Sequence, residues 1–324
     1  MKKVIMLSVL GIILILTGCA TVQQGRTGDF SWRLCDDGGS IVITDYHGRN
    51  TDVQIPSHIQ EMPVSRIGTG AFRGRQIIGV TIPDSVTYIG AWAFRENQLT
   101  NISIPNSVTS IGNMAFAFNQ LTSIEISDRI TFIGNDAFLN NQLTSVIIGN
   151  GVTTIGNNAF AHNNLTSVII PDSVISIGDF AFVRNQLTDV DIGNGVTTIG
   201  NRAFGHNYLT TVTIPDSVTS IRTQAFMDNN LTSVIIPNGI TVIENGTFEG
   251  NQLTSVSVPD NVTTIREFAF WNNQLTSIAI GNGVTLIEML AFTGNQLASV
   301  NVPSGTTISE RAFDPNVVII RKAD

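Results

Sequence analysis

Hydrophobic residues recur along most of the chain with a fixed spacing of 22 residues. Phenylalanine occupies position 72 and every 22nd position up to 292, and a final one follows at 313 after a step of 21. Other apolar positions keep the same spacing, including the leucines from Leu99 to Leu297. A repeat of this length predicts a solenoid, in which each coil buries its apolar face only against its neighbours. Two separate globular domains are excluded.

One coil contains two short extended segments. Ile102 and Ile104 alternate with polar residues, which predicts a half-buried strand with both isoleucines pointing inward. Residues 108–111 predict a second, shorter strand that ends at Gly112. The following Asn-Met-Ala-Phe at 113–116 has room for one helical turn at most, with its phenylalanine in the core.

Asparagine forms a second regular column. It recurs every 22 residues from Asn97 to Asn295, two residues before each leucine. An amide side chain both donates and accepts hydrogen bonds, so at a corner between coils it is suited to neighbouring backbone groups. We therefore expect these side chains to hold coils together rather than to bind a ligand.

The LxxIxI strand followed by the IGxxAF turn resembles the BspA-like leucine-rich repeat family of bacterial surface proteins. The resemblance covers residues 28 to about 320, and many family members carry cysteine where this chain has the asparagine column. It implies a right-handed, curved repeat solenoid with a parallel β-sheet on its concave face and short β segments or single helical turns elsewhere. It also implies display outside the cell for adhesion or protein binding, with no catalytic residue and no cofactor.

The resemblance and the repeat pattern divide the chain. We expect an N-terminal capping segment at 28–67, a repeat array at 68–303 and a C-terminal cap at 304–324.

The N-terminus has the features of an export signal. Two lysines precede a stretch at 4–16 that is apolar except for Ser8, which is too short to span a membrane. Leu-Thr-Gly-Cys at 16–19 resembles a bacterial lipobox, which implies removal of residues 1–18 and lipidation of Cys19, with 19–27 as a linker. Lipid chains at Cys19 would anchor the protein to a membrane. The alternative is an ordinary secreted protein. With Cys19 lipidated, Cys35 has no intramolecular partner, so we expect no disulfide framework.

Composition argues against several functions. Only 13% of residues are charged, and the net charge of −8 becomes −10 once the two lysines of the signal are removed. Nucleic-acid binding depends on clustered Lys and Arg and is therefore excluded. With four His and two Cys and no recognisable phosphate loop, zinc motif or nucleophile elbow, we expect neither a metal site nor an enzyme.

The outward positions of the longer strand carry the binding candidates. Most are Ser, Thr or Asn, but two isoleucines on adjacent coils are flanked by carboxylates. Such an apolar area with an acidic rim is typical of a protein contact. The alternative is that the isoleucines merely occupy a featureless β surface. The candidate contact residues are Glu125, Ile147, Ile169, Asp189, Asp191 and Ile235.

These observations predict a monomeric, exported lipoprotein of the cell envelope, displayed at the surface, that binds a protein or another cell. One alternative is an envelope spacer without a dedicated ligand. Another is a carbohydrate-binding module. The second alternative would gain if the aromatic residues near the turns were exposed and aligned: Trp92, Phe180, Phe268 and Trp271.

Two charge patterns also follow the repeat. The glycine before each turn is replaced in four late coils by Arg222, Glu244, Arg266 and Glu288, which predicts a structural charge ladder. At the turn after each main strand, Asp and Asn alternate from Asp84 to Asn282 with a period of 44 residues. We expect this alternation to keep carboxylates apart, with calcium binding as the alternative.

Overall fold

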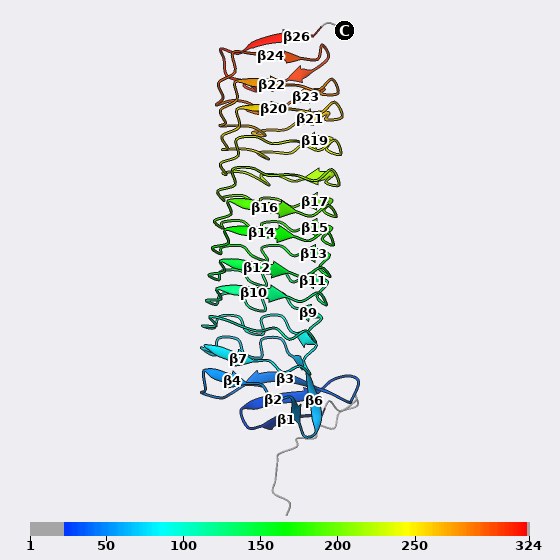
Figure 1. Cartoon of the computed structure of the whole chain (residues 1–324), viewed down its shortest axis with the longest axis vertical. Coiled ribbons are helices and arrows are strands. Elements are labelled where there is room, and N and C mark those ends of the chain that lie inside the picture. Colours follow the sequence, from blue (N-terminus) through cyan, green and yellow to red (C-terminus); the bar gives the residue numbers. More distant parts are fainter. Residues whose placement is uncertain (1–22, 323–324) are drawn as a thin grey trace, which may run out of the picture.

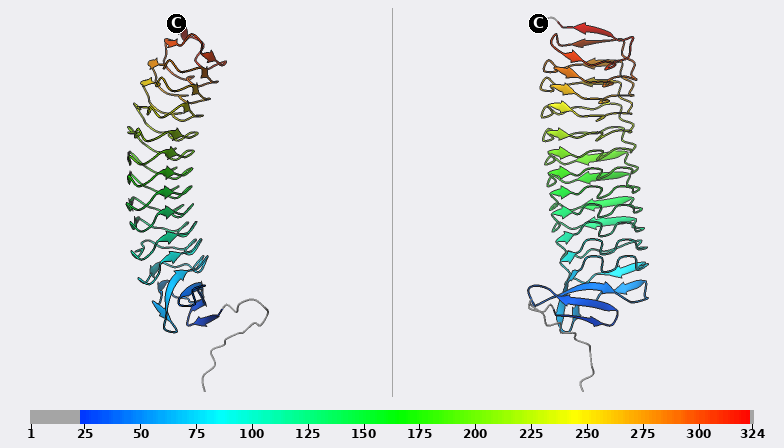
Figure 2. Two further views of the ribbon diagram at one scale, coloured as in Figure 1. Left: turned by 90° about the vertical axis from the view of Figure 1, so that its right-hand side faces the viewer. Right: turned by 180° about the vertical axis from the view of Figure 1, so that it is seen from behind.

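The computed structural model describes residues 23–322, so the expected signal sequence and Cys19 lie outside the described residues. The chain forms a parallel β-solenoid of about 13 coils. The coils stack along one axis, with the N-terminal segment at one end and the last strand at the other (Figure 1). The stack bends gently along its length (Figure 2). The solenoid predicted from the 22-residue spacing is confirmed.

The N-terminal end is closed by a small β-structure. Its strands are β1 (Gln24–Thr27), β2 (Phe30–Leu34), β3 (Ile41–Tyr46), β4 (Asp52–Gln54), β5 (His58–Ile59) and β6 (Met62–Ile67). The first three pair antiparallel, and β3 then pairs parallel with β6, which leads into the stack. Tyr46 covers the end of the core, with its ring 5.5 Å from that of Phe72. Residues 24–27, expected to end a linker, are already part of this structure.

The longer strand of each coil is here called the main strand. The main strands are β7 (Gly79–Thr81), β10 (Ser123–Ile126), β12 (Ser145–Ile148), β14 (Ser167–Ile170), β16 (Asp189–Ile192), β20 (Ser255–Ser257), β22 (Ser277–Ala279), β24 (Ser299–Val302) and β26 (Val318–Arg321). Their side chains alternate between buried and exposed, as β10 and β14 show. The main strands therefore form one outward face of the solenoid, the main-strand face.

The second strand of each coil is only two residues long. These strands are β8 (Tyr88–Ile89), β9 (Ser110–Ile111), β11 (Phe132–Ile133), β13 (Thr154–Ile155), β15 (Ser176–Ile177), β17 (Thr198–Ile199), β18 (Ser220–Ile221), β19 (Val242–Ile243), β21 (Thr264–Ile265), β23 (Leu286–Ile287) and β25 (Thr307–Ile308). They pair in register from coil to coil, with one interruption between β18 and β19.

The single helical turn expected on the third side of each coil is absent from the described residues. Tight turns replace it, and Met114 and Phe118 adopt positive φ angles of 57° and 59° in one coil. The amides of Met114, Phe116 and Phe118 each donate to a carbonyl of the next coil, at 2.8–2.9 Å. Backbone groups that a helix would pair within the segment are thus used to join coils.

The phenylalanine column forms the centre of the core. All eleven rings from Phe72 to Phe292 are almost fully buried. Successive rings stack with centroids 5.0–5.8 Å apart. Each ring is therefore in contact with the coil below and the coil above, as the periodicity predicted.

The asparagine column joins the backbones at one corner. Asn119 donates to the carbonyls of Phe94 and Phe116 at 2.9 and 3.0 Å, and its Oδ1 accepts from the amide of Leu99 at 3.1 Å. The side chain thus connects its own coil with the preceding one. The predicted structural role of this column is confirmed.

The main-strand ladder is divided into closely paired coils and open seams. Pairing over three or four residues joins β10 to β12, β14 to β16 and β20 to β22, and it also joins β4 to β7 and β24 to β26 at the two ends of the stack. In the first three pairs the second coil has glycine just after its main strand, at Gly149, Gly193 and Gly281. A Cβ added at Gly193 would lie 2.5–2.6 Å from backbone atoms of the coil beneath, so only glycine allows this approach.

The other coils carry another residue at this position. Proline takes the place of the glycine at 83, 105, 171, 215, 237, 259 and 303, and serine takes it at 127. Between β12 and β14 the main strands are not hydrogen-bonded, and the later coil carries Pro171 there. Proline has no amide proton and its ring occupies the space that glycine leaves free.

The alternation of Asp and Asn follows the same pairing. In these three pairs the backbone N–H of the Asn donates to the Oδ1 of the Asp one coil earlier, at 2.7 Å: Asn150 to Asp128, Asn194 to Asp172, and Asn282 to Asp260. Three of the five Asp–Asn pairs in the 44-residue period therefore mark a structural unit of two coils, here called a doublet. Each doublet is held by a carboxylate at one end of its main strands.

Candidate binding surface

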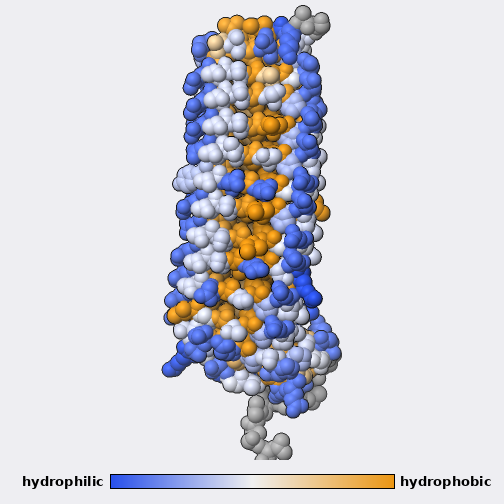
Figure 3. Space-filling model, viewed as in Figure 1, coloured by the Kyte–Doolittle hydropathy of each residue, from blue (hydrophilic) through white to orange (hydrophobic). Residues whose placement is uncertain are grey.

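The main-strand face carries all six residues predicted to contact a protein. In register, Glu125 lies opposite Ile147, and Ile169 lies opposite Asp191. Because β12 and β14 belong to adjacent coils, Ile147 and Ile169 are neighbours with a carboxylate beyond each. Their exposed fractions are 62% and 68%. Hydrophobic surface follows the middle of this face and is interrupted by hydrophilic side chains (Figure 3).

Ile235 does not join this patch. It is 83% exposed, but the coil of Thr213 separates it from Asp191. The structure therefore brings together five of the six residues and leaves Ile235 as a separate exposed side chain.

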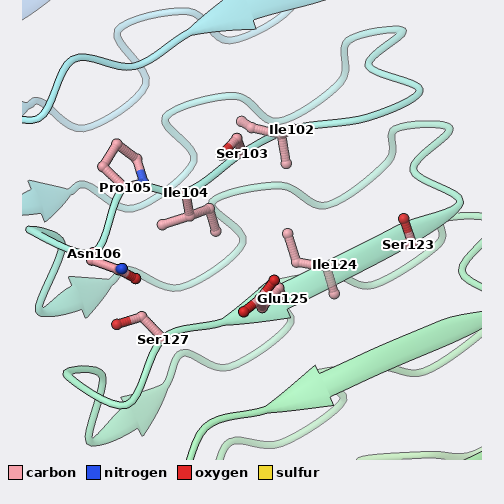
Figure 4. Close-up of a pocket in the computed structure, with 9 residues that line it drawn as sticks. All are labelled: Ile102, Ser103, Ile104, Pro105, Asn106, Ser123, Ile124, Glu125 and Ser127. Carbon is pink, nitrogen blue, oxygen red and sulfur yellow. The ribbon is translucent and has the colours of Figure 1, made fainter.

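A pocket of about 430 Å³ opens at the seam beside Glu125. Figure 4 shows Ile102, Ser103 and Ile104 on one coil facing Ser123, Ile124 and Glu125 of β10 on the next. No main-strand pairing joins these two coils. The pocket thus combines a mainly polar lining, which includes the carboxylate of Glu125, with three isoleucine side chains. Glu125 also joins it to the isoleucine patch, because Glu125 lies opposite Ile147.

A family model for the BspA-type leucine-rich repeat region matches in several overlapping segments that together span residues 46–319. The chain belongs to the BspA-type leucine-rich repeat family. None of the curated protein sequences matches the chain.

Solved structures of other bacterial leucine-rich repeat proteins share the fold. The pneumococcal vaccine antigen PcpA is 18% identical, with a TM-score of 0.61 over 93% of this chain and 99% of its own. A leucine-rich repeat protein from Bacteroides ovatus is 20% identical, with a TM-score of 0.59 over 91% and 90% of the two chains. One from Eubacterium ventriosum is also 20% identical, with a TM-score of 0.52 over 90% and 93%.

One cluster of this leucine-rich repeat protein superficially resembles a catalytic triad. Ser31 Oγ lies 2.8 Å from His47 Nε2, and Asp45 Oδ2 lies 3.6 Å from the same nitrogen. In a Ser-His-Asp triad the carboxylate orients the imidazole through Nδ1 and leaves Nε2 for the serine. Asp45 instead forms its short contact, 2.6 Å, with Arg75. The cluster is therefore a polar network of the N-terminal cap rather than a triad.

Other chemistry is sparse in the described range. Residues 23–322 contain no group of three or more His, Cys, Asp or Glu side chains suited to hold a metal ion. Within the same range no helix is long and apolar enough to cross a membrane. Cys35 is buried and unpaired as a thiol, 3.5 Å from the hydroxyl of Ser65.

The predicted charge ladder of this repeat array forms only in part. Among its four residues, the one ion pair in the described chain joins Arg266 Nε to Glu244 Oε2 at 3.4 Å. Glu288 instead accepts a hydrogen bond from the amide of Glu267 at 3.1 Å. A backbone donor of the preceding coil is nearer to this carboxylate than the arginine, so the expected alternation yields one pair rather than a row.

The pocket residues were not singled out from the sequence. Ile102, Ile104 and Ile124 belong to inward columns and were expected in a closed core. The relevant signal is the residue after each main strand, because Pro105 and Ser127 both have a Cβ where a doublet has glycine. Glu125 alone was identified at both the patch and the pocket.

Proposed function

We propose that this protein is a non-catalytic, surface-displayed lipoprotein of the cell envelope that binds a protein partner through the main-strand face. Family membership supports a repeat surface protein, and the sequence supports export and lipidation at Cys19. The observation that carries the binding proposal is the pair of exposed isoleucines between carboxylates, next to the seam pocket. Neighbouring apolar side chains with an acidic rim suit a partner whose contact surface is apolar and basic.

The pocket suggests the anchoring group of that partner. Ile102, Ile104 and Ile124 provide apolar walls for an aliphatic stem, and Glu125 provides a carboxylate for a cationic head. Arginine and lysine have this combination, and arginine is frequent among residues that dominate binding energy. The acidic net charge of the chain would favour approach of the same partner.

Selection from a random peptide library displayed on phage tests the binding proposal. Against the wild-type protein we expect enrichment of peptides that combine Arg or Lys with apolar residues. Binding of the selected peptides should be lost in the double variant Ile147→Ser with Ile169→Ser, because serine occupies the same column at Ser103 and Ser257. Ile235→Ser is the matched control and should bind normally. Absence of enrichment, or equal binding by the double variant, would contradict the proposal.

Localisation needs separate measurements. Cells grown with radiolabelled palmitate should label the wild-type protein and not Cys19→Ala, and protease added to intact cells should degrade the wild-type protein. Labelled protein that survives protease would place it on the inner side of the envelope and overturn surface display.

A further inference from the structure

The third side of the solenoid differs in composition from the other two. In each coil it contains two outward positions four residues apart, here called the turn face. The first column comprises Gly70, Trp92, Met114, Asp136, Asn158, Phe180, Arg202, Gln224, Gly246, Phe268, Leu290 and Arg311. The second column comprises Gly74, Glu96, Phe118, Asn140, His162, Arg184, His206, Asp228, Gly250, Asn272 and Gly294. The serine and threonine that dominate the main strands are absent from both columns.

The backbone of the turn face favours glycine. Every residue in both columns has a positive φ, as Gly70 and Gly246 do at 65° and 59°. Trp92, Phe180 and Phe268 nevertheless adopt 57°, 60° and 60°. Bulky side chains are rare in this conformation because the Cβ is crowded by the backbone. These aromatic residues are therefore kept against a local conformational preference, which is typical of functional positions.

The three aromatic residues are regularly spaced. Trp92, Phe180 and Phe268 occupy the same column at intervals of 88 residues, which is four coils. With core rings 5.0–5.8 Å apart from coil to coil, four coils separate two platforms by about 20 Å. Trp92 is 41% exposed, and the two phenylalanines are half-buried. The aromatic residues near the turns are thus aligned along the solenoid axis.

Each aromatic ring is held in place by a neighbour. Trp92 Nε1 lies 3.1 Å from the sulfur of Met114, and the guanidinium of Arg202 lies 5.9 Å from the ring centre of Phe180. Phe268 packs edge-on against Trp271, with centroids 6.1 Å apart. Rings fixed in this way lose little conformational freedom when a ligand stacks on them.

Polar groups between the platforms are mainly planar side chains of both charges. Arg202 Nε donates to Gln224 Oε1 at 2.7 Å, and His206 Nδ1 lies 3.2 Å from Asp228 Oδ2. Amides, carboxylates, imidazoles and guanidinium groups can each make directed hydrogen bonds to hydroxyl groups. Their mixed charge gives the face no preference for an anionic or a cationic ligand. An uncharged, hydroxyl-rich chain fits this surface.

We propose that the turn face binds a linear β-1,4-linked glycan that lies along the solenoid axis, with its sugar rings stacked on Trp92, Phe180 and Phe268. A pyranose ring is about as long as one coil is thick, so four coils correspond to about four sugars. In an extended β-1,4 chain successive rings face opposite ways, and every fourth ring presents the same face. Platforms separated by an even number of coils therefore meet equivalent apolar faces of the sugars. This site is independent of the protein-binding proposal, because it lies on a different side of each coil.

Titration calorimetry with defined oligosaccharides tests the glycan site. The probes are cellohexaose and chitohexaose, with maltohexaose as the control of different linkage and cellotriose as a ligand too short to reach two platforms. We expect at least one β-1,4 hexamer to bind and maltohexaose not to bind. Cellotriose should bind about tenfold more weakly than cellohexaose, or not at all, because it loses one stacking contact. Failure of both β-1,4 hexamers to bind, or equal binding of maltohexaose, would overturn the proposal.

Glycine substitutions separate binding from folding at these positions. Phe180→Gly removes the platform shared by both pairs and also relieves the unfavourable backbone conformation. A hexamer should then bind about tenfold more weakly, with the melting temperature unchanged or raised. Trp92→Gly leaves the pair of Phe180 and Phe268 intact. It should bind a hexamer within about twofold of the wild-type affinity, because the two pairs share Phe180 and only one of them can be occupied at a time. Arg311→Gly is the control in the same column, because it lies beyond the last platform and also has a positive φ, and it should bind normally. Unchanged binding by Phe180→Gly would contradict the proposal, as would a large loss of stability, since that would indicate a packing role.

The two proposals can fail separately. The variant Ile147→Ser with Ile169→Ser should bind the glycan as the wild type does. Phage-selected peptides that lose binding to Phe180→Gly rather than to the isoleucine variant would assign the turn face to a protein partner and overturn the glycan site.

Discussion

The doublet of coils joined at Gly193 makes a direct prediction for Gly193→Ala. The new methyl carbon would lie 2.5–2.6 Å from the carbonyl groups of Ile170 and Pro171. These are backbone atoms, so they cannot move away by a change of side-chain rotamer. The two coils must separate, which costs about 1–3 kcal/mol as overpacking. Separation also weakens the 2.7 Å bond from the amide of Asn194 to Asp172, and an exposed charge-assisted bond adds about 1 kcal/mol. We expect a total loss of about 2–4 kcal/mol.

Urea denaturation followed by far-UV circular dichroism measures the effect. A loss near 3 kcal/mol should lower the midpoint by roughly 1 M. Gly305→Ala is the matched control, because no atom lies within 4 Å of its added Cβ. The control should be neutral or stabilising by about 0.4–1 kcal/mol, since alanine restricts the unfolded chain.

A double-mutant cycle tests the mechanism. Asp172→Ala should destabilise the wild type more than it destabilises Gly193→Ala, in which its bond is already weakened. Equal midpoints for the Gly193 and Gly305 variants would refute the reasoning, because close approach of the coils would then not require glycine.

Three further predictions concern single columns of the stack. Phe182→Ala should cost about 3–5 kcal/mol in urea denaturation, and Phe313→Ala less, because Phe182 stacks on both sides and Phe313 on one; equal losses would contradict a stacked core. Glu244→Arg should lower the free energy of unfolding by less than ~1 kcal/mol, and adding Arg266→Glu should restore it. No recovery would show that the ion pair does not contribute to stability. Asn194→Asp should lower the melting temperature in low salt and recover with sodium chloride, because two carboxylates then meet across the doublet; a rise with added calcium would instead favour an ion site.

The repeat and its core could be predicted from the sequence because they depend on columns. A phenylalanine every 22 residues has one favourable location, and an asparagine at the adjacent corner has backbone groups as its nearest partners. Both predictions are confirmed by burial and by hydrogen bonds. The patch of Glu125, Ile147, Ile169 and Asp191 is also placed by register alone.

Features that depend on differences between neighbouring coils were harder to predict. The seam pocket lies where Pro105 and Ser127 take the place of glycine. A consensus sequence of the 22-residue repeat does not show such differences between individual coils. The absent helical turn has a similar cause. The sequence Asn-Met-Ala-Phe at 113–116 is compatible with a helix, but bonds to the next coil are available to the same amides and are formed instead. The alternation of Asp and Asn is visible in the sequence, which predicts a role in reducing repulsion between carboxylates. The structure adds a bond from each Asn amide to the Asp beneath it.

The division into doublets also determines how the stack should respond to mechanical load. Within a doublet the main-strand ladder and a carboxylate bond share any force along the axis. At a seam such as that between β12 and β14 the main strands carry no hydrogen bond, and the load falls on the second strands, the backbone bonds of the tight turns and the asparagine column. A pulled chain should therefore lengthen first at its seams, on one side only, and bend away from the main-strand face before any coil unfolds. Each doublet is in this respect a stiff two-coil segment, and a seam such as that between β12 and β14 is a more compliant hinge.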